Sequence, residues 1–241
     1  MTDAELILVS SDEPLSHAAS RSRRAKPKAA AVDLWLYETM GRSRGHRVIA
    51  GVDEAGRGPL AGPVVAGCVV LPDIFDLKGV NDSKKLSEKQ REEAYARILE
   101  GAVSVGVGVA DHAEIDAVNI LQASWIAMRR AVAALNPQCV PDLLLVDGLP
   151  VPNLPCAATL SIVGGDGASA SIAAASIVAK VVRDRMMRDF ETVYPGYGFA
   201  GHKGYGSSAH REALVRLGPC PIHRRSFAPV AACLSSLFDE P

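Results

Sequence analysis

The sequence lacks the features that would tie its stability or its location to special chemistry. It has five cysteines, an odd number, and no two of them have the CxxC spacing of a zinc or redox motif. We therefore expect isolated, reduced thiols and no disulfide frame. No uninterrupted apolar run approaches the roughly 18 residues that span a bilayer, and the start of the chain lacks the basic residues of a signal peptide. These absences predict a cytoplasmic protein with no membrane partner.

An excess of charge of one sign is also missing. The 241 residues include 26 Lys and Arg against 27 Asp and Glu, which gives a formal net charge of −1. The chain as a whole is not drawn to nucleic acid, so any such binding must come from local groups of basic residues. The sequence also has no Gly-rich loop ending in GK[ST], which argues against a nucleotide kinase. A chain of this length can bury an ample core without a disulfide or a structural metal.

The most informative stretch consists of two apolar runs, residues 48–52 and 64–71, which are separated by two acids and a glycine-rich loop. The pattern predicts two strands with a tight break between them. The acids are Asp53 and Glu54, and the loop covers residues 55–59. Because consecutive side chains of a regular strand point to opposite faces, we expect both acids in one site only if the pleat is broken there. The glycines permit such a break.

Hydrophobic periodicity predicts the other elements of the chain. A Ser-x-x-Gln capping box at Ser87 and Gln90 marks the start of one helix. The expected helices cover residues 32–40, 88–100, 115–135 and 169–193, and the further strands cover residues 103–109, 143–146 and 157–163. The first three strands are expected to be antiparallel, and the later alternation of strands and helices predicts an α/β layer structure with acids at one sheet edge.

Two more acids follow predicted strands. Asp147 comes before a glycine at the end of one strand, and Asp166 lies near a helix start, where the helix dipole stabilises negative charge. Singly, each acid could serve as a turn or capping residue. Four converging carboxylates would raise one another's pKa unless cations kept them ionised. No His or Cys accompanies them at ligand spacing, so Mg²⁺ or Mn²⁺ is expected, in a site suited to two-metal hydrolysis of a phosphodiester.

The motifs around these acids resemble those of the type 2 ribonucleases H, the ribonuclease HII family. The similar blocks are residues 53–59, 81–87, 119–123, 146–148, 171–181, 194–199, 202–206 and 221–227, in the family's order. The resemblance covers about residues 45 to 230. It implies an RNase H-like fold, a mixed five-stranded sheet flanked by helices with a small helical C-terminal part. It also implies an endonuclease that cuts the RNA strand of RNA–DNA hybrids.

The resemblance further implies incision on the 5′ side of a single ribonucleotide in duplex DNA, leaving 3′-hydroxyl and 5′-phosphate ends, and so the removal of misincorporated ribonucleotides. Asp53, Glu54, Asp147 and Asp166 would bind two divalent ions. The remaining implied roles belong to substrate binding. The loop Gly56-Arg57-Gly58 would recognise the 2′-hydroxyl through backbone groups, Tyr205 would pack against the sugar, and the other contacts would come from Ser83, Lys84, Lys180, Arg183 and Lys203.

Some of these roles have alternatives. Lys84 could be a solvated loop charge, Arg183 could pair with Asp184, and a structural pairing role remains open for the motif at residues 221–227. The sequence also departs from the family at Gly164 and Ala168, where basic residues are usual. We expect this difference to weaken contacts with the nucleic-acid backbone, and not to affect the chemistry.

The resemblance favours a monomer whose partners are RNA–DNA hybrids and ribonucleotide-containing duplex DNA. The expected domains are a disordered polar tail at 1–30, a catalytic domain at 31–230 with a helical subregion from about 195, and a C-terminal tail at 231–241. Residues 234–238 could dock on a sliding clamp or form a last helical turn packed on the body. A different nuclease on the same fold and a noncatalytic hybrid-binding module remain alternative functions.

Overall fold

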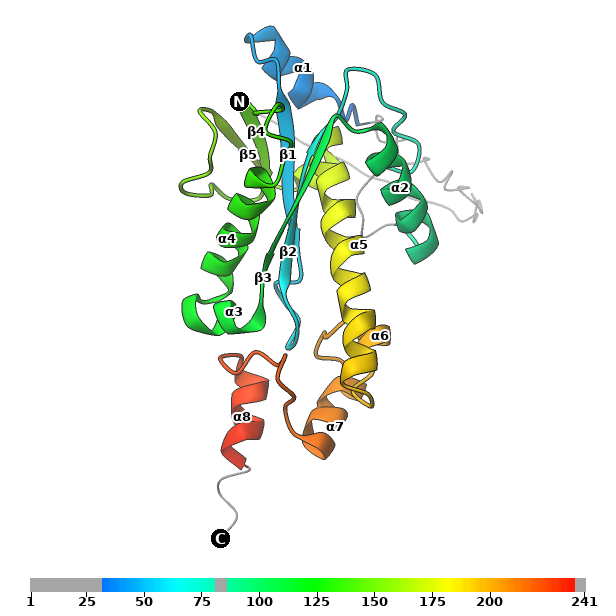
Figure 1. Cartoon of the computed structure of the whole chain (residues 1–241), viewed down its shortest axis with the longest axis vertical. Helices are drawn as coiled ribbons and strands as arrows, with labels where there is room; N and C mark the ends of the chain where they lie inside the picture. The colour runs from blue at the N-terminus through cyan, green and yellow to red at the C-terminus, as the bar shows by residue number, and fades with distance from the viewer. Residues whose placement is uncertain (1–31, 81–85, 237–241) are drawn as a thin grey trace, which may run out of the picture. The chain divides into compact units, whose positions relative to one another are not determined.

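A computed structural model of the chain describes residues 32–80 and 86–236. Its five described strands form one mixed sheet in the order β3-β2-β1-β4-β5 (Figure 1). The strands are β1 (Ile49–Ala55), β2 (Val64–Val70), β3 (Ser104–Ala110), β4 (Leu143–Asp147) and β5 (Thr159–Ile162). The first three are antiparallel, whereas β4 is parallel to both β1 and β5. The predicted mixed five-stranded sheet is confirmed.

The strand that carries the first two acids differs from the prediction. Pairing with β2 continues through both, because Asp53 lies opposite Gly67 and Glu54 lies opposite Ala66. The expected break in the pleat is therefore wrong. On its other side β1 pairs with β4 only as far as Val52, so within the described chain the acids lie where β1 has one neighbouring strand. Side chains from either face can reach around this open edge, and both acids line the same cavity.

Helices cover both faces of the sheet. Apolar side chains of α2 and α5 pack on one face, and those of α3 and α4 pack on the other (Figure 1). The helices are α1 (Leu36–Ser43), α2 (Glu88–Gly101), α3 (His112–Val118), α4 (Ile120–Ala133), α5 (Ala170–Val193), α6 (Phe199–His202), α7 (Ser208–Leu217) and α8 (Ala228–Ser236). The predicted capping box at the start of α2 is confirmed. None of the described helices is long and apolar enough to cross a bilayer.

The predicted long helix over 115–135 is two helices, α3 and α4. The chain breaks at Asn119, whose φ is 72°. Its side-chain oxygen accepts hydrogen bonds from the N–H groups of Leu121 and Gln122, at 3.0 and 3.1 Å. Asn tolerates a positive φ better than most residues and is a preferred N-cap. The apolar stripe continues across the break, and this is why periodicity alone did not reveal it.

Close packing of α5 fixes the strands that lead to the site. The residues of α5 that face the sheet are mostly alanines and serines, and the strands opposite them carry glycines. A Cβ atom on Gly51 would lie 2.1 Å from the carbonyl carbon of Ser171, and one on Gly67 would lie 2.4 Å from the carbonyl oxygen of Ala175. Neither strand can therefore move far against the helix.

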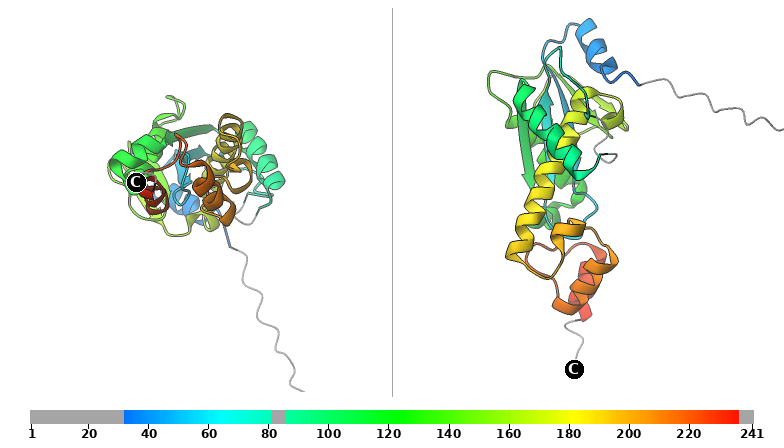
Figure 2. Two further views of the ribbon diagram at one scale, coloured as in Figure 1. Left: turned by 90° about the horizontal axis from the view of Figure 1, so that it is seen from below. Right: turned by 90° about the vertical axis from the view of Figure 1, so that its right-hand side faces the viewer.

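The C-terminal helices α6, α7 and α8 are built around the loop that follows β1. In Figure 1 and in the right-hand view of Figure 2, α7 and α8 lie beyond the end of the sheet. The N–H of Leu60 donates to the carbonyl of Gly204, and the N–H of Arg224 donates to the carbonyl of Leu60. The side chain of Leu60 packs with Leu214 and Val230. The helical C-terminal part thus contacts the segment that carries the glycine-rich loop.

Candidate active site

Three of the four predicted carboxylates come together where β1 and β4 end. Asp53 is buried, and its Oδ1 accepts the N–H of Glu54 at 2.7 Å. Burial, followed by the negative charges of Glu54 and Asp147, raises the pKa of Asp53 well above its ordinary value. Burial also raises the pKa of Glu54, against the opposing effect of Arg57. This is the electrostatic strain that a bound cation would relieve.

The fourth carboxylate, Asp166, is buried in a short 3₁₀ turn, η2 (Gly165–Gly167), between β5 and α5. The N–H of Gly165 donates to Oδ1 of Asp147 at 2.7 Å. This bond ties the turn to the end of β4, and so brings Asp166 to the same edge of the sheet as the other acids. The preceding Gly164 has a φ of 70°, a conformation that disfavours any larger residue.

A buried acid that the sequence analysis did not single out, Glu38 of α1, contacts the start of α5. Oε1 of Glu38 accepts from Oγ of Ser169 at 2.7 Å, and from N and Oγ of Ser171 at 2.9 and 2.5 Å. Glu38 is 2 % exposed, and no described residue donates to its Oε2. One signal for this contact is present in the sequence, because Glu38 lies four residues after Leu34 in the helix expected over residues 32–40, and so on the same helix face.

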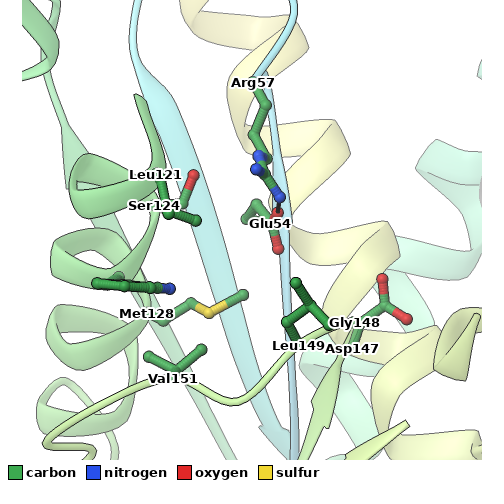
Figure 3. A pocket seen from close by; sticks show the side chains of 10 residues that line it. Glu54, Arg57, Leu121, Ser124, Met128, Asp147, Gly148, Leu149 and Val151 are labelled. Atoms are coloured by element: carbon green, nitrogen blue, oxygen red, sulfur yellow. Dashed lines mark hydrogen bonds and ion pairs between the residues drawn. The ribbon is translucent and has the colours of Figure 1, made fainter. Parts of the chain in front are cut away.

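The acids open into a cavity of about 270 Å³ that the glycine-rich loop also lines. Its walls are Asp53, Glu54, Asp147, Ser176, Lys180, Tyr205 and residues 55–58. Nη1 of Arg57 lies 3.2 Å from Oε1 of Glu54, so a basic side chain pairs with one of the acids that line this cavity (Figure 3). The structure thus joins the two parts of the predicted site, the acids and the loop, in one space.

A second cavity, of about 150 Å³, lies on the α4 side of the Arg57–Glu54 ion pair (Figure 3). Its apolar wall consists of Leu121, Trp125, Met128, Leu149 and Val151. Part of the apolar pattern that predicted the helix over residues 115–135 therefore faces an open space. Glu54, Arg57 and Asp147 line both cavities, so the two form a groove that crosses the acids. A groove of this kind suits an extended ligand.

The predicted basic contacts occupy different environments. Lys180 lines the larger cavity, and its Nζ lies 2.7 Å from Oδ1 of Asp184. Arg183 is fully buried and donates to the carbonyls of Ala61, Pro63 and Lys203 at 2.9–3.3 Å. Its guanidinium is enclosed by protein, so it does not meet a phosphate at the surface described here. The carboxylate of Asp184 pairs with Lys180, and it acts on Arg183 through its nearby negative charge.

Two other predicted residues lie just after α6. Lys203 is 8 % exposed, and its Nζ donates to the carbonyl of Ala200. Tyr205 is 45 % exposed and faces the larger cavity, with the guanidinium carbon of Arg183 5.9 Å from its ring centroid. The aromatic ring is therefore open to a ligand, whereas the ammonium group is largely covered. Ser83 and Lys84 lie outside the described residues.

The carboxylates fit a hard divalent cation, although they are not arranged as a filled metal centre. Within residues 32–80 and 86–236, no group of three or more His, Cys, Asp or Glu side chains has the close spacing of a metal site. The larger cavity nevertheless offers carboxylate and hydroxyl oxygens from Asp53, Glu54, Asp147 and Ser176, and neither imidazole nor thiol lines it. Oxygen donors of this kind suit Mg²⁺ or Mn²⁺ and not zinc.

The pattern GxSxG, typical of serine hydrolases, occurs at residues 41–45 but not in a catalytic setting. Ser43 is the last residue of α1, and its Oγ donates to the carbonyl of Met40 at 2.8 Å. A nucleophilic serine of that class lies on a sharp turn from a strand into a helix. The position of Ser43 at the end of a helix excludes this interpretation.

The sheet order and the acids from β1, β4 and the turn before α5 define an RNase H-like nuclease. A family model described as "Ribonuclease HII" matches residues 50–230. The Ribonuclease HII of Geobacter sulfurreducens is 57% identical over 198 residues, which cover 82% of this chain and 89% of the relative. The chain therefore belongs to the ribonuclease HII family, which is dependent on divalent metal ions, and it is a ribonuclease H.

Solved structures agree with this assignment. The ribonuclease H2 of Pyrococcus horikoshii OT3 has a TM-score of 0.66 and 27% sequence identity, and the match covers 80% of this chain and all of that one. The structure described as the PCNA:RNase HII complex from Archaeoglobus fulgidus has a TM-score of 0.63 and 26% identity, covering 75% and 95% of the two chains. Both likenesses extend over most of the described fold.

Proposed function

We propose that this ribonuclease H hydrolyses the RNA strand of RNA–DNA hybrids and also incises on the 5′ side of a single ribonucleotide in duplex DNA. The products would carry 3′-hydroxyl and 5′-phosphate ends. One observation supports the finer specificity. The cavity that holds Asp53 and Glu54 is lined on its other side by the Gly56–Gly58 loop and by Tyr205. Groups suited to contact a ribose therefore adjoin the groups suited to cut beside it.

Asp53, Glu54, Asp147 and Asp166 are the residues proposed to hold two divalent cations. Bound there, Mg²⁺ or Mn²⁺ would activate a water molecule and stabilise the leaving oxygen. The protein's own contribution is to hold the carboxylates in a fixed orientation. The N–H of Glu54 holds the Asp53 carboxylate, and the N–H of Gly165 holds that of Asp147, so each keeps its orientation before substrate arrives.

Recognition of the ribonucleotide is assigned to the loop and the tyrosine. Gly58 is exposed, and a Cβ atom on it would lie 3.6 Å from Cε1 of Tyr205. Gly58 and Tyr205 therefore lie side by side on the cavity wall, where one sugar would contact both the backbone of the loop and the aromatic ring. Lys180, at the rim of the same cavity, would place a positive charge near a phosphate.

The test is cleavage of a DNA duplex with one ribonucleotide in Mg²⁺, Mn²⁺ or EDTA, beside an all-DNA duplex and a long RNA–DNA hybrid. We expect a metal-dependent cut 5′ to the ribonucleotide and no cut in the all-DNA duplex. Cleavage of the long hybrid alone would refute the roles of the loop and of Tyr205. Equal cleavage of the duplexes with and without the 2′-hydroxyl would favour a different nuclease on the same fold.

A second proposal concerns the end of the chain, because one structural relative was solved as a complex with PCNA. In this chain Leu234 belongs to α8 and packs beside Leu60, Leu214 and Val230, so this residue follows the helical alternative. Residues 237–241, including Phe238, lie outside the described part. We expect the intact protein to bind the sliding clamp of the same cell in a pull-down and Phe238→Ala to lose that binding. No capture of the intact protein would end the proposal.

A further inference from the structure

The guanidinium of Arg224 is fully buried beneath the glycine-rich loop, where four peptide carbonyls accept its hydrogen bonds. Nε donates to the carbonyl of Gly62 at 2.9 Å, and Nη1 donates to that of Arg57 at 2.9 Å. Nη2 donates to the carbonyls of Gly56 and Pro63, at 2.6 and 3.2 Å. One side chain from the C-terminal part thus holds both ends of the loop between β1 and β2.

This contact is costly to build, which makes its geometry informative. Burial, followed by the positive charge of Arg183, lowers the pKa of Arg224 to about 9, so the group stays protonated at neutral pH. Keeping a charge inside a protein destabilises the fold unless its donors are well satisfied. Arg183 approaches the same loop from α5 and shares the carbonyl of Pro63, but it contacts neither Gly56 nor Arg57 through a hydrogen bond. Only Arg224, within the described chain, bonds to the carbonyls of those two residues.

The orientation of these two carbonyls fixes the orientation of two N–H groups. In a planar trans peptide, the C=O of one residue and the N–H of the next point in opposite directions. The carbonyls of Gly56 and Arg57 point inward to Arg224, so the N–H groups of Arg57 and Gly58 point outward. No described residue accepts a hydrogen bond from either N–H. Residues 56–58 line the cavity that contains the acids, so these donors are available to a ligand there.

We propose that Arg224 is a positioning residue for ribonucleotide selection. By turning the Gly56 and Arg57 carbonyls into the protein, it presents the N–H groups of Arg57 and Gly58 as a fixed pair of donors to the 2′-hydroxyl and the adjacent phosphate oxygen of the substrate. The inference rests on the proposed function, because it concerns how the loop distinguishes ribose from deoxyribose. Arg224 itself touches no substrate.

The test replaces Arg224 by lysine, which keeps the charge but cannot serve the carbonyls of both Gly56 and Arg57 with a planar fork. Arg225→Lys is the matched control, because Arg225 is exposed and lines a separate cavity with His112 and Asp116. Binding is measured in EDTA to a duplex with one ribonucleotide and to the all-DNA duplex. In Mg²⁺, kcat/KM is measured on the single-ribonucleotide duplex and on a long hybrid.

We expect Arg224→Lys to reduce the ribonucleotide preference in binding by about tenfold, the effect of about one lost hydrogen bond. Its kcat/KM should fall more on the single-ribonucleotide duplex than on the long hybrid, which offers many 2′-hydroxyls. Arg225→Lys should match the wild type in both measurements. A folded Arg224→Lys with unchanged preference would overturn the positioning role while leaving the proposed function intact. A wild-type protein with no preference and no cleavage would instead overturn the proposed function.

A second measurement covers the case in which Arg224→Lys does not fold. In the wild-type protein in EDTA, the amide resonances of Arg57 and Gly58 are followed by NMR during titration with each duplex. We expect both resonances to shift with the single-ribonucleotide duplex and to shift less with the all-DNA duplex. Identical shifts with the two duplexes would also overturn the proposal, because the donors would then make no distinction between the sugars.

Discussion

Arg183 fills the space into which a side chain on Gly56 would project. A Cβ atom at position 56 would lie 2.0 Å from Nε of Arg183, and the φ of Gly56 is +98°. The glycine is therefore required by a buried guanidinium of the protein itself. Gly58 differs, because it is exposed and a Cβ atom there would meet only the ring of Tyr205. The two positions can be separated experimentally.

Gly56→Ala should unfold more readily than Gly58→Ala. The positive φ alone costs about 1–3 kcal/mol for a residue with a Cβ, and the contact with Arg183 adds to this cost. Gly58 has an ordinary φ and its Cβ would meet only Tyr205, at 3.6 Å, so its free energy of unfolding should change by no more than about 0.5 kcal/mol. Gly58→Ala should still cut the single-ribonucleotide duplex poorly. Urea unfolding and cleavage assays test the pair, and equal stabilities would contradict the steric argument.

Asp53→Asn should abolish cleavage and largely preserve binding in EDTA, because it removes a metal-binding charge without removing bulk. The structure adds an expectation about stability. Asp53 is buried beside Glu54 and Asp147, so a neutral side chain should relieve repulsion in the metal-free protein. Mn²⁺ should raise the melting temperature of the wild type and raise that of Asp53→Asn less. Equal shifts in the melting temperatures of the two proteins on adding Mn²⁺ would contradict the metal assignment. Near-normal turnover by Asp53→Asn would contradict it as well.

Glu38→Ala should destabilise the protein by about 1–3 kcal/mol, because buried donors of Ser169 and Ser171 at the start of α5 would lose their acceptor. Glu100→Ala is a suitable control, since Glu100 is exposed near the end of α2. The measurement is the free energy of unfolding in urea for both variants. If Glu38→Ala loses no more unfolding free energy than Glu100→Ala, water must replace the carboxylate as the acceptor.

Acid should weaken the C-terminal part through a buried histidine pair. Nε2 of His210 lies 3.1 Å from Nε2 of His223, a hydrogen bond that needs one unprotonated nitrogen. Burial, followed by the charge of His210, lowers the pKa of His223 to about 4, and burial also lowers the pKa of His210. The neighbouring titratable groups are His112, His202 and Cys220.

For such a histidine the unfolded chain, with a pKa of about 6.5, binds a proton before the folded chain does. The contribution of the unprotonated histidine to the stability of the fold is therefore complete above about pH 6.5, and it is lost as the pH falls toward about 4. We expect the melting temperature of the wild type to fall more steeply over this range than that of His223→Gln. If the melting temperatures of the two proteins fall in parallel with pH, other groups dominate acid unfolding.

The sequence predicted the sheet well, because strands depend on local patterns. Apolar runs mark β1, β2 and β4, and the runs of β1 and β4 lead directly into Asp53 and Asp147, which line one cavity. The buried charges could not be predicted in this way. Glu38, Arg183 and Arg224 belong to residue types that are usually exposed, and each has a partner 120 to 168 positions away along the chain. Only the tertiary fold shows that they face inward.

The distance along the chain between Gly56 and Arg224, 168 positions, also bears on how the protein is made. A ribosome releases β1, β4 and the turn with Asp166 well before it releases Arg224. During translation the carboxylates can gather before the loop beside them has acquired its last support. Under the role proposed for Arg224, the residues proposed to cut are therefore synthesised before the residue that orients the loop for selection.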